Sequence, residues 1–333
     1  MLLLKPMSVL KRLGVDTFLI LLFAAIVLAI LLPVSGEAAR LLSCFAKGMI
    51  GLLFFLYGVR LDPASIVAGM RNWKLQGAIL LNTFLVFPLL AVGLTRAFSR
   101  VLEPDLIAGL LFLSVLPSTI QSSIALTGLA QGNVPAAICG ASLSNLIGVL
   151  LTPILVGVLL HANGGGGGFD GIVRVAMQIL LPFALGQIAR PWIFGWVSKH
   201  NRLTQVVDRG SIALIVYSAF SAGSVAGIWQ DLALSTLVLI VVANSVLLGL
   251  AMLSGLAFCW AAGMSSADRI TVLLCGATKS LASGLLIANV LFGDRSISVI
   301  ILPAMIFHQL QIVVSSLIAR RAARRVDTQI PAQ

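Results

Sequence analysis

The chain has 333 residues, of which 59% are hydrophobic and 10% are charged, and its formal net charge is +11. A soluble domain carries about 25% charged residues, so this composition excludes an ordinary soluble domain and indicates a polytopic membrane protein. A basic chain could also bind nucleic acid, but these charges lie in short loops between apolar stretches, as membrane topology requires. We therefore expect a lipid bilayer and no nucleic acid as its surroundings.

Ten apolar stretches follow one another along the chain. Their expected bounds are 17–34, 41–59, 74–97, 106–130, 134–160, 171–189, 206–228, 232–262, 270–292 and 297–319. A helix needs about 20 apolar residues to cross a bilayer, so we predict an all-α protein with ten transmembrane helices. The first stretch could instead be a signal peptide with a loose cleavage region at 35–39. We expect the sixth stretch to end before Pro191, because the residue before a proline disfavours helical backbone.

Five consecutive glycines at 164–168 separate the first five stretches from the last five. Such a run makes a flexible linker. We predict an N-terminal repeat at 1–163, a C-terminal repeat at 169–322 and a tail at 323–333. An odd number of spans in each half gives the two repeats opposite orientations in the membrane.

The distribution of basic residues predicts the orientation of the chain. Fifteen lysines and arginines fall on the side that holds both termini and six on the other, and Lys279 completes the 22. Loops rich in lysine and arginine stay in the cytoplasm. We therefore expect an integral protein of the plasma (inner) membrane with both termini in the cytoplasm.

Polar residues interrupt the fourth and the ninth stretch, which occupy the same place in each half. Pro117 lies in the fourth, and Lys279 lies between Gly276 and Gly284 in the ninth. Proline removes a backbone donor, and a cation at the centre of a membrane helix costs about 2.5–3.5 kcal/mol on insertion scales. Paired helix breaks of this kind are typical of the binding site of an inverted-repeat transporter.

The candidate substrate-binding or ion-binding residues are polar groups of the two breaks and of the stretches that follow them. They are Pro117, Ser118, Thr119, Gln121, Ser122, Ser123, Ser144, Asn145, Thr278, Lys279, Ser280, Ser283, His308 and Gln309, with Gln311 close by. Each has a structural alternative: a proline kink patched by hydroxyls, a snorkelling lysine, or hydrogen bonds between helices for Asn145 and His308.

Lys279 could act in three ways. Its ammonium could be a fixed cation, it could attract an anionic substrate, or it could release a proton. His308 could relay protons. The four cysteines lie in or beside apolar stretches, so we expect no disulfide and no metal cluster. Hydrolase and nucleotide-binding motifs are absent from the sequence, so we expect neither an enzyme nor an organic cofactor.

The sequence around these breaks resembles the bile acid:sodium symporter family, and in particular its SBF-like branch. The resemblance rests on P-S-T-I-Q-S-S-I-A-L-T-G-L-A-Q-G-N-V from Pro117, L-C-G-A-T-K-S-L-A-S-G-L around Lys279, and G-L-L-F-F-L-Y-G-V-R-L from Gly51. It implies ten helices in two inverted five-helix repeats. Helices one, two, six and seven would form a panel domain and the others a core domain. The broken fourth and ninth helices would cross near the middle of the membrane, with substrate in the cleft between the domains.

The resemblance also implies positions for sodium ligands. A Ser-Asn pair after the first break is replaced by Ser122-Ser123, and the fifth-span ligands fall on Ala137 and Ala141. The ninth-span ligands fall on Ala277 and Leu281, with Lys279 between them. Sodium remains conceivable as a coupling ion, but most of its ligands are missing. The lysine would then replace one or both ions.

Together these features predict a secondary transporter of an amphipathic organic anion, either bile-acid-like or a small carboxylate, that works by alternating access. One alternative is a sodium-independent carrier, proton-coupled or facilitative. Another is a membrane sensor or regulator without flux of its own. An intramembrane hydrolase built on Lys279 and Ser280 is a weaker alternative, because adjacent helix residues point apart. The substrate, the direction of transport and the oligomeric state are left open by the sequence.

Overall fold

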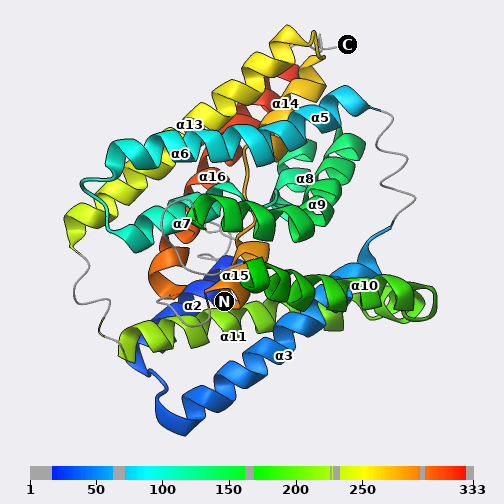
Figure 1. The fold of residues 1–333 in the computed structure, drawn as a ribbon. Helices are drawn as coiled ribbons and strands as arrows, with labels where there is room; N and C mark the ends of the chain where they lie inside the picture. The colour runs from blue at the N-terminus through cyan, green and yellow to red at the C-terminus, as the bar shows by residue number, and fades with distance from the viewer. Residues whose placement is uncertain are drawn as a thin grey trace, which may run out of the picture. The chain divides into compact units, whose positions relative to one another are not determined.

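The computed structural model describes residues 17–62, 72–161, 169–225, 227, 233–292 and 297–327. Within these ranges the chain forms helices joined by turns and loops, without a strand (Figure 1). The helices are α2 (Thr17–Leu31), α3 (Gly36–Arg60), α5 (Trp73–Leu81), α6 (Phe87–Phe98), α7 (Pro104–Ser114), α8 (Gln121–Leu129), α9 (Val134–His161), α10 (Phe169–Lys199), α11 (Asn201–Val225), α13 (Leu234–Ala261), α14 (Ser266–Gly276), α15 (Leu281–Leu291) and α16 (Ile297–Asp327). A π-helical turn, η1 (Asn82–Val86), joins α5 to α6.

Six helical segments of the described chain are long and apolar enough to cross a membrane. They are Gly36–Arg60, Trp73–Phe98, Val134–Leu160, Leu234–Ala261, Ser266–Leu291 and Ile297–Arg324. The chain is therefore an all-helical integral membrane protein. The segment Ser266–Leu291 differs from the others, because 89% of its most apolar stretch is buried inside the protein, against 39–50% elsewhere. This segment contains the second break, and non-helical backbone at membrane depth is tolerated where protein covers it.

The expected end of the sixth stretch before Pro191 is wrong. Helix α10 continues through Pro191 to Lys199. Its last turns pack on the rest of the protein: Ile193 and Val197 join a cluster with Leu56 and Val59 of α3 and Val207 of α11. The burial of these side chains outweighs the one helical hydrogen bond that the proline removes.

The described helices divide into two compact units that do not follow the two halves of the sequence. Helices α2, α3, α10 and α11 form unit 1, and helices α5 to α9 with α13 and α14 form unit 2. The boundary between the units passes through α15 after Ser283 and through α16 after Ile301. Each unit therefore combines segments from before and after the glycine linker at 164–168, which itself lies outside the described residues. The predicted division into two repeats stays a prediction.

In unit 1, helices α3 and α10 approach each other closely through two glycines. A Cβ atom added to Gly58 would fall on the main-chain carbonyl of Phe183, and one added to Gly186 would fall on that of Phe55. The close approach lets Gln187 Nε2 donate to the carbonyl oxygens of Gly58 (2.8 Å) and Leu61 (3.1 Å). Small residues commonly mediate such helix contacts in membranes.

Replacing Gly58 by alanine is therefore expected to destabilise unit 1. The new methyl group meets backbone atoms, which cannot rotate away, and overpacking of this kind costs about 1–3 kcal/mol. The measurement is thermal unfolding in detergent. Gly48→Ala on the same helix is the matched control, because no atom lies within 4 Å of its Cβ position. Alanine there should be neutral or stabilising by up to about 1 kcal/mol, and equal effects of the two variants would contradict the contact.

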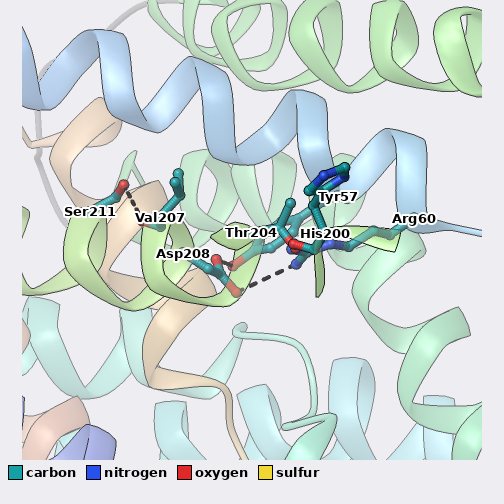
Figure 2. A network of polar contacts seen from close by, with 7 residues as sticks. All are labelled: Tyr57, Arg60, His200, Thr204, Val207, Asp208 and Ser211. Carbon is teal, nitrogen blue, oxygen red and sulfur yellow. Dashed lines mark hydrogen bonds and ion pairs between the residues drawn. The ribbon is translucent and has the colours of Figure 1, made fainter. Parts of the chain in front are cut away.

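A polar cluster joins the end of α3 to α11 in the same unit (Figure 2). Tyr57 donates its hydroxyl to Asp208 Oδ1 (3.1 Å), and Arg60 Nη1 lies 3.7 Å from Asp208 Oδ2. At the other end of α11, Tyr217 and Ser221 donate to the carbonyl oxygens of Leu32 (2.8 Å) and Val34 (3.3 Å). Helix α11 is thus tied to the chain before α3 and to the last turn of α3.

In unit 2, helices α5, η1 and α6 run along α13, as the cyan and yellow ribbons of Figure 1 show. A hydrophobic cluster joins this layer to α14 and α9, through Leu75, Ile79, Ala137, Cys259 and Val272. The broken helix α14–α15 therefore begins against an apolar wall that α5 and α13 provide.

Candidate functional site

The first break spans residues 115–120, between α7 and α8, and its backbone is completed by side chains of α9. The N–H of Ser118 donates to Ser144 Oγ (3.0 Å), and Asn145 Nδ2 donates to the carbonyl of Ser118 (2.7 Å). Thr152 Oγ1 donates to the carbonyl of Val115 (2.8 Å). A break that is buried in protein needs such partners, because unpaired backbone groups are costly there.

The second break spans residues 277–280, between α14 and α15. Ser280 caps α15, because its Oγ accepts the N–H of Ser283 (3.2 Å). The carbonyl of Gly276, at the end of α14, accepts from Asn82 Nδ2 (3.1 Å) and Thr83 Oγ1 (3.3 Å). The π-helical turn that begins at Asn82 therefore holds the end of α14.

The two breaks contact each other directly, although about 160 residues separate them. The N–H of Ser280 donates to the carbonyl of Pro117 (2.8 Å), and Thr119 Oγ1 donates to the carbonyl of Lys279 (2.9 Å). Thr278 Oγ1 lies 3.2 Å from Ser118 Oγ and 2.9 Å from Ser123 Oγ. We call this meeting of residues 115–123 and 277–283 the crossing.

The side chain of Lys279 is 1% exposed, and main-chain carbonyls surround its ammonium. Its Nζ donates to the carbonyl oxygens of Ser114 (2.6 Å), Thr83 (2.7 Å) and Leu116 (2.9 Å). The same nitrogen lies 4.2 Å from the ring centroid of Phe87, within range of a cation–π interaction. The three carbonyls and this ring form what we call the cradle.

Helix interruptions make the cradle carbonyls available. Ser114 ends α7, so its carbonyl is one of the unpaired acceptors at a helix C-terminus, where the dipole favours a cation. In η1 the N–H of Phe87 bonds the carbonyl of Asn82, five residues back. In that register the carbonyl of Thr83 would pair with residue 88, which is proline and has no N–H.

Three acceptors match the three N–H donors of an ammonium group. A neutral amine has two N–H donors and would leave one buried carbonyl unpaired. The described partners of Lys279 Nζ include no carboxylate. The cradle therefore suits a positively charged ammonium, whose charge the backbone dipoles balance. A neutral amine in the same place would leave one carbonyl without a hydrogen bond.

Eleven of the fourteen candidate residues meet at the crossing, in the cradle or beside them. These are Pro117, Ser118, Thr119, Ser123, Ser144, Asn145, Thr278, Lys279, Ser280, Ser283 and His308. The other three, Gln121, Ser122 and Gln309, are exposed or half-buried and have no described hydrogen bond to this network. Whether any of the fourteen binds a ligand stays a prediction.

At four of the positions where the resemblance places sodium ligands, the structure has buried apolar side chains. Ala137, Ala141 and Ala277 are 0% exposed, and Leu281 is 3% exposed. None of these side chains offers an oxygen, whereas a hard cation needs several. The nearby charge is that of Lys279.

Sequence reasoning missed Asn82 and Thr83, which hold the crossing, and named Gln311 only as a neighbour of the candidate residues. Asn82 and Thr83 bind the end of α14, and Gln311 of α16 pairs with the main chain of Lys279. The signal for the first two was a polar pair followed by Pro88 inside an apolar stretch. The first break likewise combines a proline with polar residues, although there the polar residues follow Pro117.

The sequence profile of the SBF-like CPA transporter family matches residues 16–324. An uncharacterized protein of Pseudomonas aeruginosa is 44% identical over 313 residues, with 94% of each chain covered. YfeH of Escherichia coli, whose name marks it as a candidate symporter, is 39% identical over 318 residues, with 96% of each chain covered. Sodium/bile acid cotransporter 7 of Rattus norvegicus is 25% identical over 322 residues, with 94% of each covered.

Proposed function

The chain belongs to the SBF-like CPA transporter family, and we propose that it carries an amphipathic organic anion across the plasma (inner) membrane by alternating access. The substrate would be bile-acid-like or a small carboxylate. In this proposal ten helices form two inverted repeats, and both termini lie in the cytoplasm. Membership of the family makes the chain a membrane transporter of the bile acid:sodium symporter type.

The observation that carries the proposal is the crossing. Two interrupted helices meet in one buried polar network, and the N–H of Ser280 bonds the carbonyl of Pro117 (2.8 Å). Secondary transporters place substrate and ion sites at such breaks, because half-helix ends supply charges and unpaired backbone groups. The cation at this crossing, Lys279, would favour an anionic substrate.

We further propose that transport does not depend on sodium, because Lys279 takes the place of a coupling cation. The ammonium already occupies a cradle of carbonyl oxygens at the end of α7. The side chains at Ala137, Ala141, Ala277 and Leu281 supply no further oxygen. A sodium ion brought to the cradle would lose its best ligands to the ammonium and would be repelled by it.

The test is counterflow of labelled organic anions in proteoliposomes, with a panel of bile-acid-like compounds and small carboxylates. We expect accumulation that is equal in sodium, potassium and choline chloride at one ionic strength. Accumulation that requires sodium would overturn sodium independence and leave a symporter. If no compound of either class shows counterflow in vesicles that contain folded protein, the carrier proposal fails in favour of a sensor or regulator without flux.

A further inference from the structure

The main chain of Lys279 is held by the side chain of Gln311. The N–H of Lys279 donates to Gln311 Oε1 (2.7 Å), and Gln311 Nε2 donates to the carbonyl of Lys279 (2.8 Å). An N–H can only donate and a carbonyl can only accept, so this pair fixes which end of the amide is oxygen and which is nitrogen. Gln311 is 1% exposed. It therefore gives the non-helical residue Lys279 the two hydrogen bonds that a helix would otherwise provide.

The same amide fixes the protonation state of His308, three residues earlier on α16. Gln311 Nε2 lies 2.9 Å from His308 Nδ1. Because Nε2 carries only donors, Nδ1 must accept and so has no proton. His308 is 93% buried, and in this arrangement its imidazole is neutral with the proton on Nε2.

The described contacts of the α16 residues near His308 include no carboxylate that could balance an imidazolium. Thr119 of the first break reaches Gln311, Phe87 of α6 stacks edge-on against Phe307, and Asn244 of α13 bonds the carbonyl of Pro303. None of these titrates. The ionisable group on the neighbouring break is Lys279, whose charged form is a cation, and the acidic residues of α7 and α14 lie in the first turns of those helices.

We propose that Gln311 is the positioning residue of the crossing and that a proton taken up at His308 Nδ1 releases it. An imidazolium donates from both nitrogens, so a proton on Nδ1 would face the N–H of Gln311. An amide that turns its oxygen to the imidazolium gives up both bonds to Lys279. The latch, defined as His308, Gln311 and the main chain of Lys279, is closed with neutral His308 and opens as pH falls.

The latch is a proton-sensitive step at the crossing. Its effect on transport rests on the proposed function, whereas its opening does not. A direct test is ¹⁵N NMR of the protein labelled at histidine, in lipid. The sequence has three histidines, His161, His200 and His308, and His161→Gln leaves two. His200 Nδ1 lies 2.9 Å from the carbonyl of Trp196, so it must carry a proton and serves as the opposite tautomer.

At about pH 7.5 we expect His308 to show an unprotonated Nδ1 and a protonated Nε2. A proton on His308 Nδ1 at that pH would overturn the proposal. Gln311→Glu puts a carboxylate beside the ring, and the imidazolium should then persist at a pH where the parent protein is neutral. Gln309→Glu, on another face of α16, is the control, and an identical response of the two variants would also overturn it.

Hydrogen exchange then tests the release itself. Exchange of the Lys279 amide, corrected for its intrinsic pH dependence, should rise about tenfold when the pH is lowered from about 7.5 to the value at which the ¹⁵N spectrum shows His308 protonated. His308→Leu should abolish this rise, and a rise that survives the substitution would refute the latch. Counterflow across the same pH range separates the two proposals. A working latch without flux refutes the carrier alone, and flux with a pH-independent amide refutes the latch alone.

Discussion

Replacing Lys279 by alanine should lower the thermal stability of the protein in choline chloride and make that stability respond to sodium or potassium chloride. The wild-type protein should unfold at the same temperature in all three salts. Removing the ammonium leaves the carbonyls of Thr83, Ser114 and Leu116 without a donor, and each buried unpaired acceptor costs about 1–3 kcal/mol. The free energy of unfolding should therefore fall by several kcal/mol, the largest effect that we expect of any single substitution.

The salt response follows from the space that the lysine side chain leaves. A cation that enters the cradle binds only the folded protein and so stabilises it by RT ln(1 + [L]/Kd), about 2.7 kcal/mol at 100 times the Kd. Lys279→Met separates charge from volume, because its side chain fills most of the space and offers no donor. This variant should be destabilised in every salt without rescue.

Lys74→Ala is the matched control, because Lys74 is exposed and its Nζ lies 5.9 Å from the Trp73 ring centroid. Its loss should change stability by less than about 0.5 kcal/mol. A sodium-specific rise in the wild-type protein would mean that a separate ion site exists, and sodium symport would become the better proposal. If Lys279→Ala transports fully and still ignores sodium, Lys279 does not replace an ion.

The helices and their breaks could be predicted because both follow from local composition. Apolar stretches of membrane length predict helices whatever their partners. Pro117 and Lys279 stand out because a missing donor and a charge are conspicuous inside such stretches. The structure breaks the helices at 115–120 and 277–280, around these two residues.

The partners across the crossing could not be predicted from the sequence, because they depend on contacts between distant segments. Lys279 is 196 residues from Thr83 and 32 from Gln311. Within α16, residues three apart share a face, so His308 and Gln311 meet while Gln309 points elsewhere. The sequence marks His308, Gln309 and Gln311 equally, as polar residues inside an apolar stretch. Only the rotation of the helix against its neighbours selects two of them.

Tertiary packing also explains why α10 continues past its predicted boundary. Pro191 disfavours helix at the residue before it, yet α10 runs on to Lys199. Val197 is 3% exposed, and it would lose its contacts with α3 if the helix ended at Arg190. The preference of the residue before a proline for non-helical backbone is overcome here, because several apolar side chains that follow Pro191 are buried.

Asn82→Leu should be the second most damaging substitution, with a loss of about 2–4 kcal/mol. Asn82 Nδ2 donates to the carbonyls of Ala251 (3.0 Å) and Gly276 (3.1 Å), and its Oδ1 accepts from Ser254 Oγ (2.8 Å). The side chain is 4% exposed and joins η1, α13 and the end of α14. Leucine has a similar volume but can make none of these bonds, so polar atoms of both neighbouring helices lose a partner.

Part of the stability lost in Asn82→Leu should come from the bond to Ser254, and a double-mutant cycle measures this part. Ser254→Ala removes one donor to Asn82 and should cost about 1 kcal/mol, whereas Ser245→Ala, an exposed serine that bonds within α13, should be neutral. Because Asn82 and Ser254 share a bond, the double variant should lose less stability than the sum of the single variants. Additive losses would show that Asn82 and Ser254 act independently, and an Asn82→Leu protein within about 0.5 kcal/mol of wild type would show that the π-helical turn does not anchor the crossing. In that case the bond to Lys279 Nζ, and not the bonds of Asn82, would hold the carbonyl of Thr83 in place.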